Sequence, residues 1–539
     1  MNIQTLLQNK IAEALKSLGV DIDASTIVIE TSKEAIHGDF ASNIAMQSAG
    51  KLKKPPRAIA EDIKNVINMD GLDKVEIAGP GFLNFFVAPS KLAEIISQIN
   101  EEGAKFGESK IGEGQKINVE FVSANPTGDL HLGHARGAAL GDAICRLYEA
   151  CGYDVTREYY VNDAGAQIDN LAESLYVRYM ELFGEQLELP KDGYAASDII
   201  DIAKELKNEV GNKYVNNYST SFFKNYGIKK ELEKINEDLK LFRVPFDVYT
   251  YETDIRKEGA MEKLLNDLEP FTYHLEGATF LKTSEYGDDK DRVIVKSDGD
   301  YTYFLPDIAY HLDKLSRGYN LLIDVLGSDH HGYIARMKAA MQMFGYPSSI
   351  LEVEMLQMVR LIKDGEEVVM SKRTGNAVTL RELCEEVGVD AVRYFFVNRA
   401  STSHLDFDID LAIQASSANP VYYAQYAYAR LYAVLRRGKH FDISYDGEGL
   451  TSKYETDLMK QLANFPLVVE DAALTRSPYK LTNYIQKLAS DIHAFYTECR
   501  LLDESNPNLT ANRLGLAKVS AEVIKKALNL IGVNSPKKM

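Results

Sequence analysis

The spacing of apolar residues predicts a small folded unit at the start of the chain. Leucine, isoleucine and alanine recur at helical intervals through residues 6–18 and stop before Gly19, which predicts an amphipathic helix. A strand-like run follows at residues 26–30, and a second at residues 82–87 comes after a glycine-proline-glycine turn signal. These patterns predict an α+β unit, and the charged, glycine-bearing stretch 101–114 is expected to be a linker.

The pattern changes near residue 116. A short apolar run at residues 117–122 is typical of a buried parallel strand, and a loop at residues 123–130 follows it. Residues 131–151 carry small apolar side chains on one helical face, and residues 154–161 have the composition of a second strand. This strand–helix–strand order is the unit of a doubly wound parallel sheet.

The rest of the chain divides into an interrupted sheet and a helical end. Residues 165–270 show mostly helical patterns and are rich in charged side chains, as expected for an insertion into the sheet. Four later runs have the length and composition of strands: 246–251, 278–282, 320–326 and 353–362. After about residue 405 only helical patterns remain. We therefore predict a multidomain α/β protein, with an α+β domain at 1–110, a Rossmann-type domain with a helical insertion at 111–405, and an all-α domain at 406–539.

Composition narrows the class of protein. The 539 residues include no stretch of about 18 apolar residues, and the first ten residues are polar, so neither a membrane span nor a secretory signal is expected. The four cysteines are scattered without a C-x-x-C pair, which argues against zinc and favours a reduced cytoplasm. A net charge of −18 argues against non-specific nucleic-acid binding, because phosphate contacts need lysine and arginine.

One candidate for phosphate chemistry lies where the first parallel strand meets its helix. The segment 125–134 reads NPTGDLHLGH, and open α/β sheets bind ligands at such strand ends. His131 and His134 are three residues apart, so both share one helix face and are able to donate to phosphate oxygens. Gly133 lets a nucleotide approach the backbone. For this motif alone, two exposed histidines at a helix N-terminus remain the simpler interpretation.

A second candidate is the segment 370–376, which reads MSKRTGN and follows a strand-like run. Lysine and arginine in a glycine-bearing loop are able to hold a nucleotide triphosphate during in-line attack at phosphorus. Taken alone, this segment is better explained as a basic surface loop.

Together the two motifs resemble one family. Residues 123–168 are similar to the HIGH region of arginyl-tRNA synthetases, with HLGH in the place of HIGH. VMSKR at residues 369–373 resembles the KMSKS loop and departs from it at Val369 and Arg373. Further similarity covers nearly the whole chain, at residues 38–46, 53–63, 79–86, 421–430 and 532–539.

The resemblance implies a monomeric, cytoplasmic class I aminoacyl-tRNA synthetase. Its substrates would be ATP, L-arginine and tRNA(Arg), with Mg²⁺ arriving on ATP. In this family the N-terminal domain lies against the tRNA elbow and the C-terminal domain binds the anticodon. The resemblance also implies that tRNA must be bound before arginine is activated.

The resemblance also implies residue roles. The catalytic residues would be His131, His134 and Lys372. ATP would be bound by Pro126, Thr127, Gly128, Gly133, Asp329, His330, Met370 and Ser371. Arginine would be bound by Glu120, Asn125, Glu252, Tyr303 and Asp307. The tRNA would be bound by Asn43, Tyr422, Tyr426, Arg430 and Met539, with bases stacked on the tyrosines. No metal site is expected in the protein itself.

Several of these residues have simpler explanations. Tyr303 would be a core aromatic of a strand, Asp307 a helix N-cap, and Glu252 an exposed loop acid. The tyrosines near residue 425 would only pack a helix. Ser328 stands where other members have glutamine, and is too short to reach as far. Two other functions remain: a class I synthetase for another amino acid, such as cysteine, and a synthetase-like RNA-binding protein without catalysis.

Overall fold

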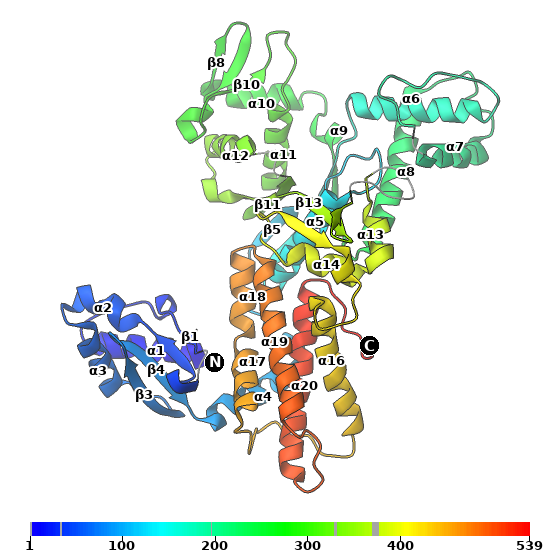
Figure 1. Cartoon of the computed structure of the whole chain (residues 1–539). Coiled ribbons are helices and arrows are strands. Elements are labelled where there is room, and N and C mark those ends of the chain that lie inside the picture. The colour runs from blue at the N-terminus through cyan, green and yellow to red at the C-terminus, as the bar shows by residue number, and fades with distance from the viewer. Residues whose placement is uncertain (1–2, 33–34, 196, 328–330, 369–376) are drawn as a thin grey trace.

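The computed structural model describes residues 3–32, 35–195, 197–327, 331–368 and 377–539. Figure 1 shows an N-terminal unit beside a column of helices, and above the column a sheet flanked by two lobes. One lobe holds α10–α12 with β8–β10, and the other holds α6–α8. This arrangement confirms the predicted fold class: an α+β unit, a doubly wound sheet with a helical insertion, and a helical C-terminal part.

The N-terminal unit is an antiparallel sheet in the order β1-β2-β4-β3, packed against helices. Its elements are α1 (Ile3–Ser17), β1 (Glu30–Thr31), β2 (Phe40–Ser42), α2 (Ile44–Leu52), α3 (Pro56–Val66), β3 (Leu72–Ala78) and β4 (Phe82–Val87). The predicted strand at residues 26–30 is wrong, because Asp23 accepts a hydrogen bond from the Ser25 backbone N–H at 2.9 Å and starts a 3₁₀ turn.

The connection to the sheet is not a free linker. Helix α4 (Pro89–Glu102) packs on helices α17 and α20 of the C-terminal column, and Ser97 donates to the Tyr445 carbonyl at 2.7 Å. The following stretch contains only a 3₁₀ turn, Gly103–Lys105, before the first parallel strand. Lys526 then binds Glu108 at 2.9 Å, so this stretch is tied to the last helix of the chain.

The central sheet has five parallel strands in the order β12-β11-β5-β6-β7. The strands are β5 (Lys116–Glu120), β6 (Asp154–Val161), β7 (Val248–Tyr251), β11 (Leu321–Gly327) and β12 (Leu351–Leu356). The helix after β5 is α5 (Leu132–Ala150), close to the predicted range. The order reverses between β5 and β11, and this switch point is where such sheets bind ligands.

Two insertions interrupt the sheet. Between β6 and β7 lie α6 (Ala166–Glu181), α7 (Ser197–Val210) and α8 (Thr220–Leu241). Between β7 and β11 lie α9 (Glu252–Ile255), α10 (Ala260–Leu268), β8 (Thr272–Leu275), β9 (Ala278–Leu281), β10 (Arg292–Val295) and α11 (Phe304–Ser316). The insertion between β7 and β11 has its own apolar core, which it shares with α12 (His331–Met343).

The predicted strand at residues 353–362 is two strands in different sheets. Its first half belongs to β12, and its second half is β13 (Val359–Lys363), which pairs with β14 (Glu366–Glu367) and β15 (Leu405–Asp408). The presence of β15 also corrects the expectation that only helices follow residue 405. Local apolar content does not reveal which neighbour a strand pairs with.

Apart from β15, the elements described after β14 are helices. They are α13 (Leu380–Val387), α14 (Val389–Val397), α15 (Ile409–Ala412), α16 (Pro420–Arg437), α17 (Lys453–Ala463), α18 (Phe465–Leu474), α19 (Pro478–Glu498) and α20 (Pro507–Leu530). Helix α16 packs against α19 and α20, and these long helices form much of the column (Figure 1). Within the described part of the chain, no helix is both long and apolar enough to cross a membrane.

Candidate active site

The backbone turns sharply where β5 ends. Val122 and Ser123 have φ values of 67° and 40°, in the left-handed region that residues with a Cβ rarely occupy. The Ser123 hydroxyl donates to Glu120 at 3.0 Å and accepts from the Tyr160 backbone N–H at 3.1 Å. These two hydrogen bonds hold the strained turn, which directs the following loop across the end of the sheet.

The two predicted histidines form the N-terminal cap of α5. His131 is the N-cap, and its Nδ1 accepts the Gly133 backbone N–H at 3.1 Å. His134 Nδ1 accepts the His131 backbone N–H at 3.4 Å, and the two rings stack with centroids 3.7 Å apart. Because each Nδ1 is an acceptor, each neutral ring carries its proton on Nε2 and has that N–H as its remaining donor.

Both imidazoles are neutral at physiological pH. Burial lowers the pKa of His131, and burial together with His131 lowers the pKa of His134 to about 4. A neutral pair of donors at a helix N-terminus suits an anion, because the positive end of the α5 dipole lies there.

The loop before these histidines is compact. Pro126 is buried, and the Thr127 backbone N–H donates to the Asn125 carbonyl at 2.8 Å in a tight turn. A Cβ on Gly128 would meet nothing within 4 Å, whereas one on Gly133 would lie 3.0 Å from the His131 ring. Gly133 therefore leaves the His131 ring free to stack, which is a reason for glycine in addition to the one inferred from the sequence.

The residues that follow the second motif, Thr379 and Leu380, lie beside the first motif. The Leu380 backbone N–H donates to the Leu130 carbonyl at 2.8 Å, and His131 forms a β-bridge with Thr379. Thr379 caps α13 through a capping box with Glu382. Five residues with predicted roles, Asp329, His330, Met370, Ser371 and Lys372, lie outside the described residues, as does Ser328.

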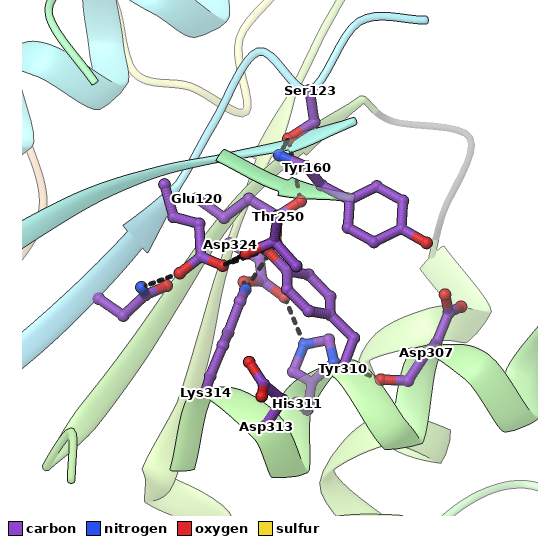
Figure 2. A network of polar contacts seen from close by, with 12 residues as sticks. Glu120, Ser123, Tyr160, Thr250, Asp307, Tyr310, His311, Asp313, Lys314 and Asp324 are labelled. Atoms are coloured by element: carbon purple, nitrogen blue, oxygen red, sulfur yellow. Dashed lines mark hydrogen bonds and ion pairs between the residues drawn. The ribbon is translucent and has the colours of Figure 1, made fainter. Parts of the chain in front are cut away.

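A buried charged network fills the space between β5, β11 and α11 (Figure 2). Lys314 binds Glu120 at 2.5 Å and Asp324 at 3.0 Å, and its side chain is fully buried. His311 bridges Asp324, at 2.8 Å, and the Asp307 carbonyl, at 2.7 Å. These contacts lock α11 against the sheet, so the Glu120 carboxylate is already paired within the protein.

Asp307 differs from its neighbours because no hydrogen bond or ion pair to its carboxylate is recorded among the described residues. Figure 2 shows this carboxylate directed away from His311 and Lys314, on the side of Tyr160. Burial raises its pKa to about 7, against the smaller opposing effects of His311 and Arg336. A raised pKa is expected for a buried acid that has no bound cation, and a cationic ligand would restore the negative charge of the carboxylate.

Glu252 and Asp307 both act on Tyr160. Burial raises the pKa of Tyr160, and the next largest causes are the negative charges of Glu252 and Asp307. Glu252 is 8% exposed and accepts from Arg256 Nε at 2.7 Å. The Asn162 amide nitrogen, in its satisfied orientation, donates to the other oxygen of Glu252 at 2.7 Å.

The simpler explanations for the predicted arginine-binding residues fail. Glu252 is a buried residue rather than an exposed loop acid, and the N-cap of α11 is Tyr303 rather than Asp307. Tyr303 is 84% exposed, so it is not a core aromatic. Asn125 is also exposed and donates to Gln167 at 2.8 Å, at the entrance to α6.

Sequence reasoning missed Tyr160, His311, Lys314 and Asp324. One signal was available: Asp307, His311 and Lys314 are four and then three residues apart, which places them on one face of a helix. For Tyr160 and Asp324 no local signal exists, because their strands look like ordinary buried strands.

The predicted tRNA contacts lie on the C-terminal column and the N-terminal unit. Tyr422 and Tyr426 stack with centroids 5.8 Å apart on α16, and Tyr426 is 40% exposed. Arg430 continues this row, 5.5 Å from the Tyr426 ring and 3.8 Å from the Tyr496 ring. Tyr428 is buried, so this tyrosine packs the helix, as the alternative to base stacking predicts.

The remaining two predicted tRNA contacts are far apart in the chain. Asn43 precedes α2, and its buried Oδ1 has no hydrogen-bond partner in the described part of the chain. Met539 is the last residue and is 49% exposed.

A parallel sheet in this order, a histidine-capped helix at its switch point and insertions on either side of β7 define a class I aminoacyl-tRNA synthetase. Sequence families agree: "tRNA synthetases class I (R), catalytic domain" matches residues 95–406, "Arginyl tRNA synthetase N terminal domain" matches 5–87, and "DALR anticodon binding domain" matches 424–539. The chain belongs to the arginyl-tRNA synthetase family.

Individual relatives resemble the chain over its full length. Arginine--tRNA ligase 1 of Halalkalibacterium halodurans is 50% identical over 99% of this chain and 98% of its own. Arginine--tRNA ligase of Bacillus subtilis is 48% identical, and the match covers both chains completely. The arginyl-tRNA synthetase structure from Thermus thermophilus, at 22% identity, has the same fold with a TM-score of 0.77 over 99% of both chains.

Proposed function

We propose that this site activates L-arginine with ATP and transfers it to the 3′ end of tRNA(Arg). The observation that carries this proposal is the Asp307 carboxylate. The described residues give it no hydrogen bond or ion pair, and it lies on the side of Tyr160, whose pKa the buried Glu252 also raises. Carboxylates of this kind suit a guanidinium, which is planar, permanently charged and donates in a fork. Glu120, Asn125 and Tyr303 complete the proposed arginine site around the ends of β5 and α11.

In the first step, the arginine carboxylate attacks the α-phosphorus of ATP, and the bond to pyrophosphate breaks. Positioning and charge stabilisation dominate such a step. The Nε2–H groups of His131 and His134 donate to phosphate oxygens, and Gly133 with the loop of Pro126, Thr127 and Gly128 borders the nucleotide. Lys372, Met370, Ser371, Asp329 and His330 are proposed to complete the ATP site.

In the second step, the terminal ribose hydroxyl of tRNA attacks the carbonyl carbon of the adenylate, and AMP leaves. Tyr422, Tyr426 and Arg430 offer stacking surfaces and a positive charge to unpaired anticodon bases. Asn43 and Met539 are proposed as further tRNA contacts. The proposed division of labour is tRNA binding by residues 1–110 and 406–539, and chemistry by residues 111–405.

We further propose that the enzyme acts as a monomer in the cytoplasm, with Mg²⁺ brought by the phosphates of ATP. The four cysteines, Cys145, Cys151, Cys384 and Cys499, are all buried and unpaired, as suits a reducing compartment.

The proposed specificity is tested by ATP–pyrophosphate exchange with each of the twenty amino acids in turn, with and without tRNA(Arg). We expect exchange with arginine and tRNA present, and none with lysine, whose point charge does not match a fork-shaped site. Exchange with another amino acid would support a different class I synthetase. No exchange with any of them, together with retained tRNA binding, would support a non-catalytic RNA-binding protein.

The raised pKa of Asp307 predicts a pH-dependent affinity for arginine. The guanidinium stays charged throughout this range, whereas Asp307, with a pKa of about 7, is mostly neutral at pH 6 and mostly ionised at pH 8. Arginine must therefore displace a proton at low pH, and its KM should be about tenfold higher at pH 6 than at pH 8. Steady-state exchange kinetics across this range measure the effect, and the KM for ATP is the internal control. A flat arginine profile would show that Asp307 does not face the guanidinium.

A further inference from the structure

Helix α8 of the insertion contacts the described flanks of both signature motifs. Near its middle, Lys234 binds Asp129 at 3.0 Å, two residues before the N-cap histidine of α5. One turn further on, Asp238 forms an ion pair with Arg381, in the first turn of α13. Figure 1 shows α8 running from the insertion lobe towards α13.

These contacts close a triangle. The third side is the backbone hydrogen bond from Leu380 to the Leu130 carbonyl at 2.8 Å, with the bridge between His131 and Thr379. The start of α5, the start of α13 and the middle of α8 are thus each tied to the other two. We call Lys234 and Asp238, with their partners Asp129 and Arg381, the α8 brace.

The far end of α8 is fixed as well. The fully buried Arg393 donates to the Phe242 carbonyl at 2.9 Å, and Arg243 binds Asp390 at 2.5 Å. Arg393 also pairs with Asp142 in the middle of α5. Because α8 is held at this end, its brace residues present fixed positions to the two motif flanks.

Lys234 makes most of the ion pairs of the brace. Besides Asp129, it contacts Asp198 at 2.6 Å and Glu231 at 3.4 Å, so one ammonium stands among three carboxylates. These acids raise the pKa of Lys234 although burial opposes them. Without the ammonium, Asp129 would face the like charge of Asp198 and would be pushed away from α8, whereas burial already raises the pKa of Glu231 to about 7.

We propose that the α8 brace positions the histidine-capped start of α5 for the phosphate chemistry, so that Lys234 and Asp238 are positioning residues for amino-acid activation. This inference rests on the proposed function. A shift of the α5 start would move the Nε2 donors of His131 and His134, whereas Asp307 and Glu252 lie on other elements. Loss of the brace should therefore affect ATP use and turnover but not arginine affinity.

The test is ATP–pyrophosphate exchange by the full-length protein with arginine and tRNA(Arg), on Lys234→Met and Asp238→Asn. Each should lower kcat/KM for ATP about tenfold, with the KM for arginine unchanged, since misplacement of catalytic groups by an ångström costs up to about a hundredfold. Lys229→Met is the matched control, because it removes an exposed ion pair of α8 with Glu233, 3.8 Å long, outside the triangle. It should retain wild-type kinetics.

A second variant separates positioning from folding. In Lys234→Met/Asp129→Asn the repelling charge is gone, so this double variant should recover most of the loss seen in Lys234→Met alone. Melting curves and active-site titration correct for unfolded protein. Wild-type kinetics in Lys234→Met and Asp238→Asn, or a double variant as impaired as Lys234→Met alone, would overturn the brace. An inactive wild-type protein would instead overturn the proposed function.

Discussion

Asp307→Asn should lower kcat/KM for arginine by about two to three orders of magnitude. The substitution keeps the size of the side chain but removes its charge and one acceptor, so the guanidinium would lose a charge-assisted partner. Losing one member of a buried ion pair costs roughly 3–5 kcal/mol, and about 1.4 kcal/mol corresponds to a factor of ten. Although burial dominates the pKa of Asp307, the residue keeps some exposure to solvent, so the lower part of that range is expected. Steady-state exchange kinetics with varied arginine measure the loss.

The control for Asp307→Asn is the KM for ATP measured on the same protein. It should change little, because none of the residues proposed to bind ATP lies on α11. The melting temperature should not fall, since Asp307 accepts no recorded hydrogen bond and its burial as an anion is unfavourable. A normal kcat/KM for arginine would remove Asp307 from the site.

His134→Ala should lower the exchange kcat by about two to three orders of magnitude, the usual cost of removing one preorganised donor to developing charge. The neutral ring has one donor left, Nε2–H, because Nδ1 accepts the His131 backbone N–H. The same substitution removes a helix-cap acceptor, which costs about 1 kcal/mol of stability. Exchange rates and a melting curve on one sample measure both effects.

His134→Gln is the matched control. Its amide nitrogen can take the place of Nε2 as a donor, and glutamine at this N3 position can also accept the His131 backbone N–H, so it should recover most of the exchange rate and of the stability. If the histidines were only a solvent-exposed helix cap, His134→Ala would be less stable but have normal turnover. Equal turnover in His134→Ala and in the wild type would therefore exclude a catalytic role.

The sequence by itself determined the class of fold and the position of the nucleotide-facing helix. The strand at residues 154–161, the helix after residue 131 and the charged insertion were all predictable, because apolar periodicity reports local structure. The motif at residues 125–134 predicted a ligand site because a parallel strand followed directly by a helix places the helix N-terminus at the edge of a sheet.

Pairing between distant strands was not predictable. The apolar run at residues 353–362 gives no sign that its two halves join different sheets, and residues 26–30 resemble a strand although Asp23 starts a turn there. Strand pairing depends on long-range contacts, which local composition does not encode.

Only the tertiary structure distinguished the acids of the site from one another. In sequence, Glu120, Asp307 and Asp324 are three carboxylates that follow apolar residues. Folding pairs Glu120 and Asp324 with the buried Lys314, whereas no ion pair joins Asp307 to a cation among the residues that the structure describes. The charge state of a carboxylate depends on burial and on neighbours within a few ångströms, and those neighbours come from strands and helices up to about 200 residues away. The sequence could therefore name the candidate acids, whereas the fold decided which of them are paired with a buried lysine.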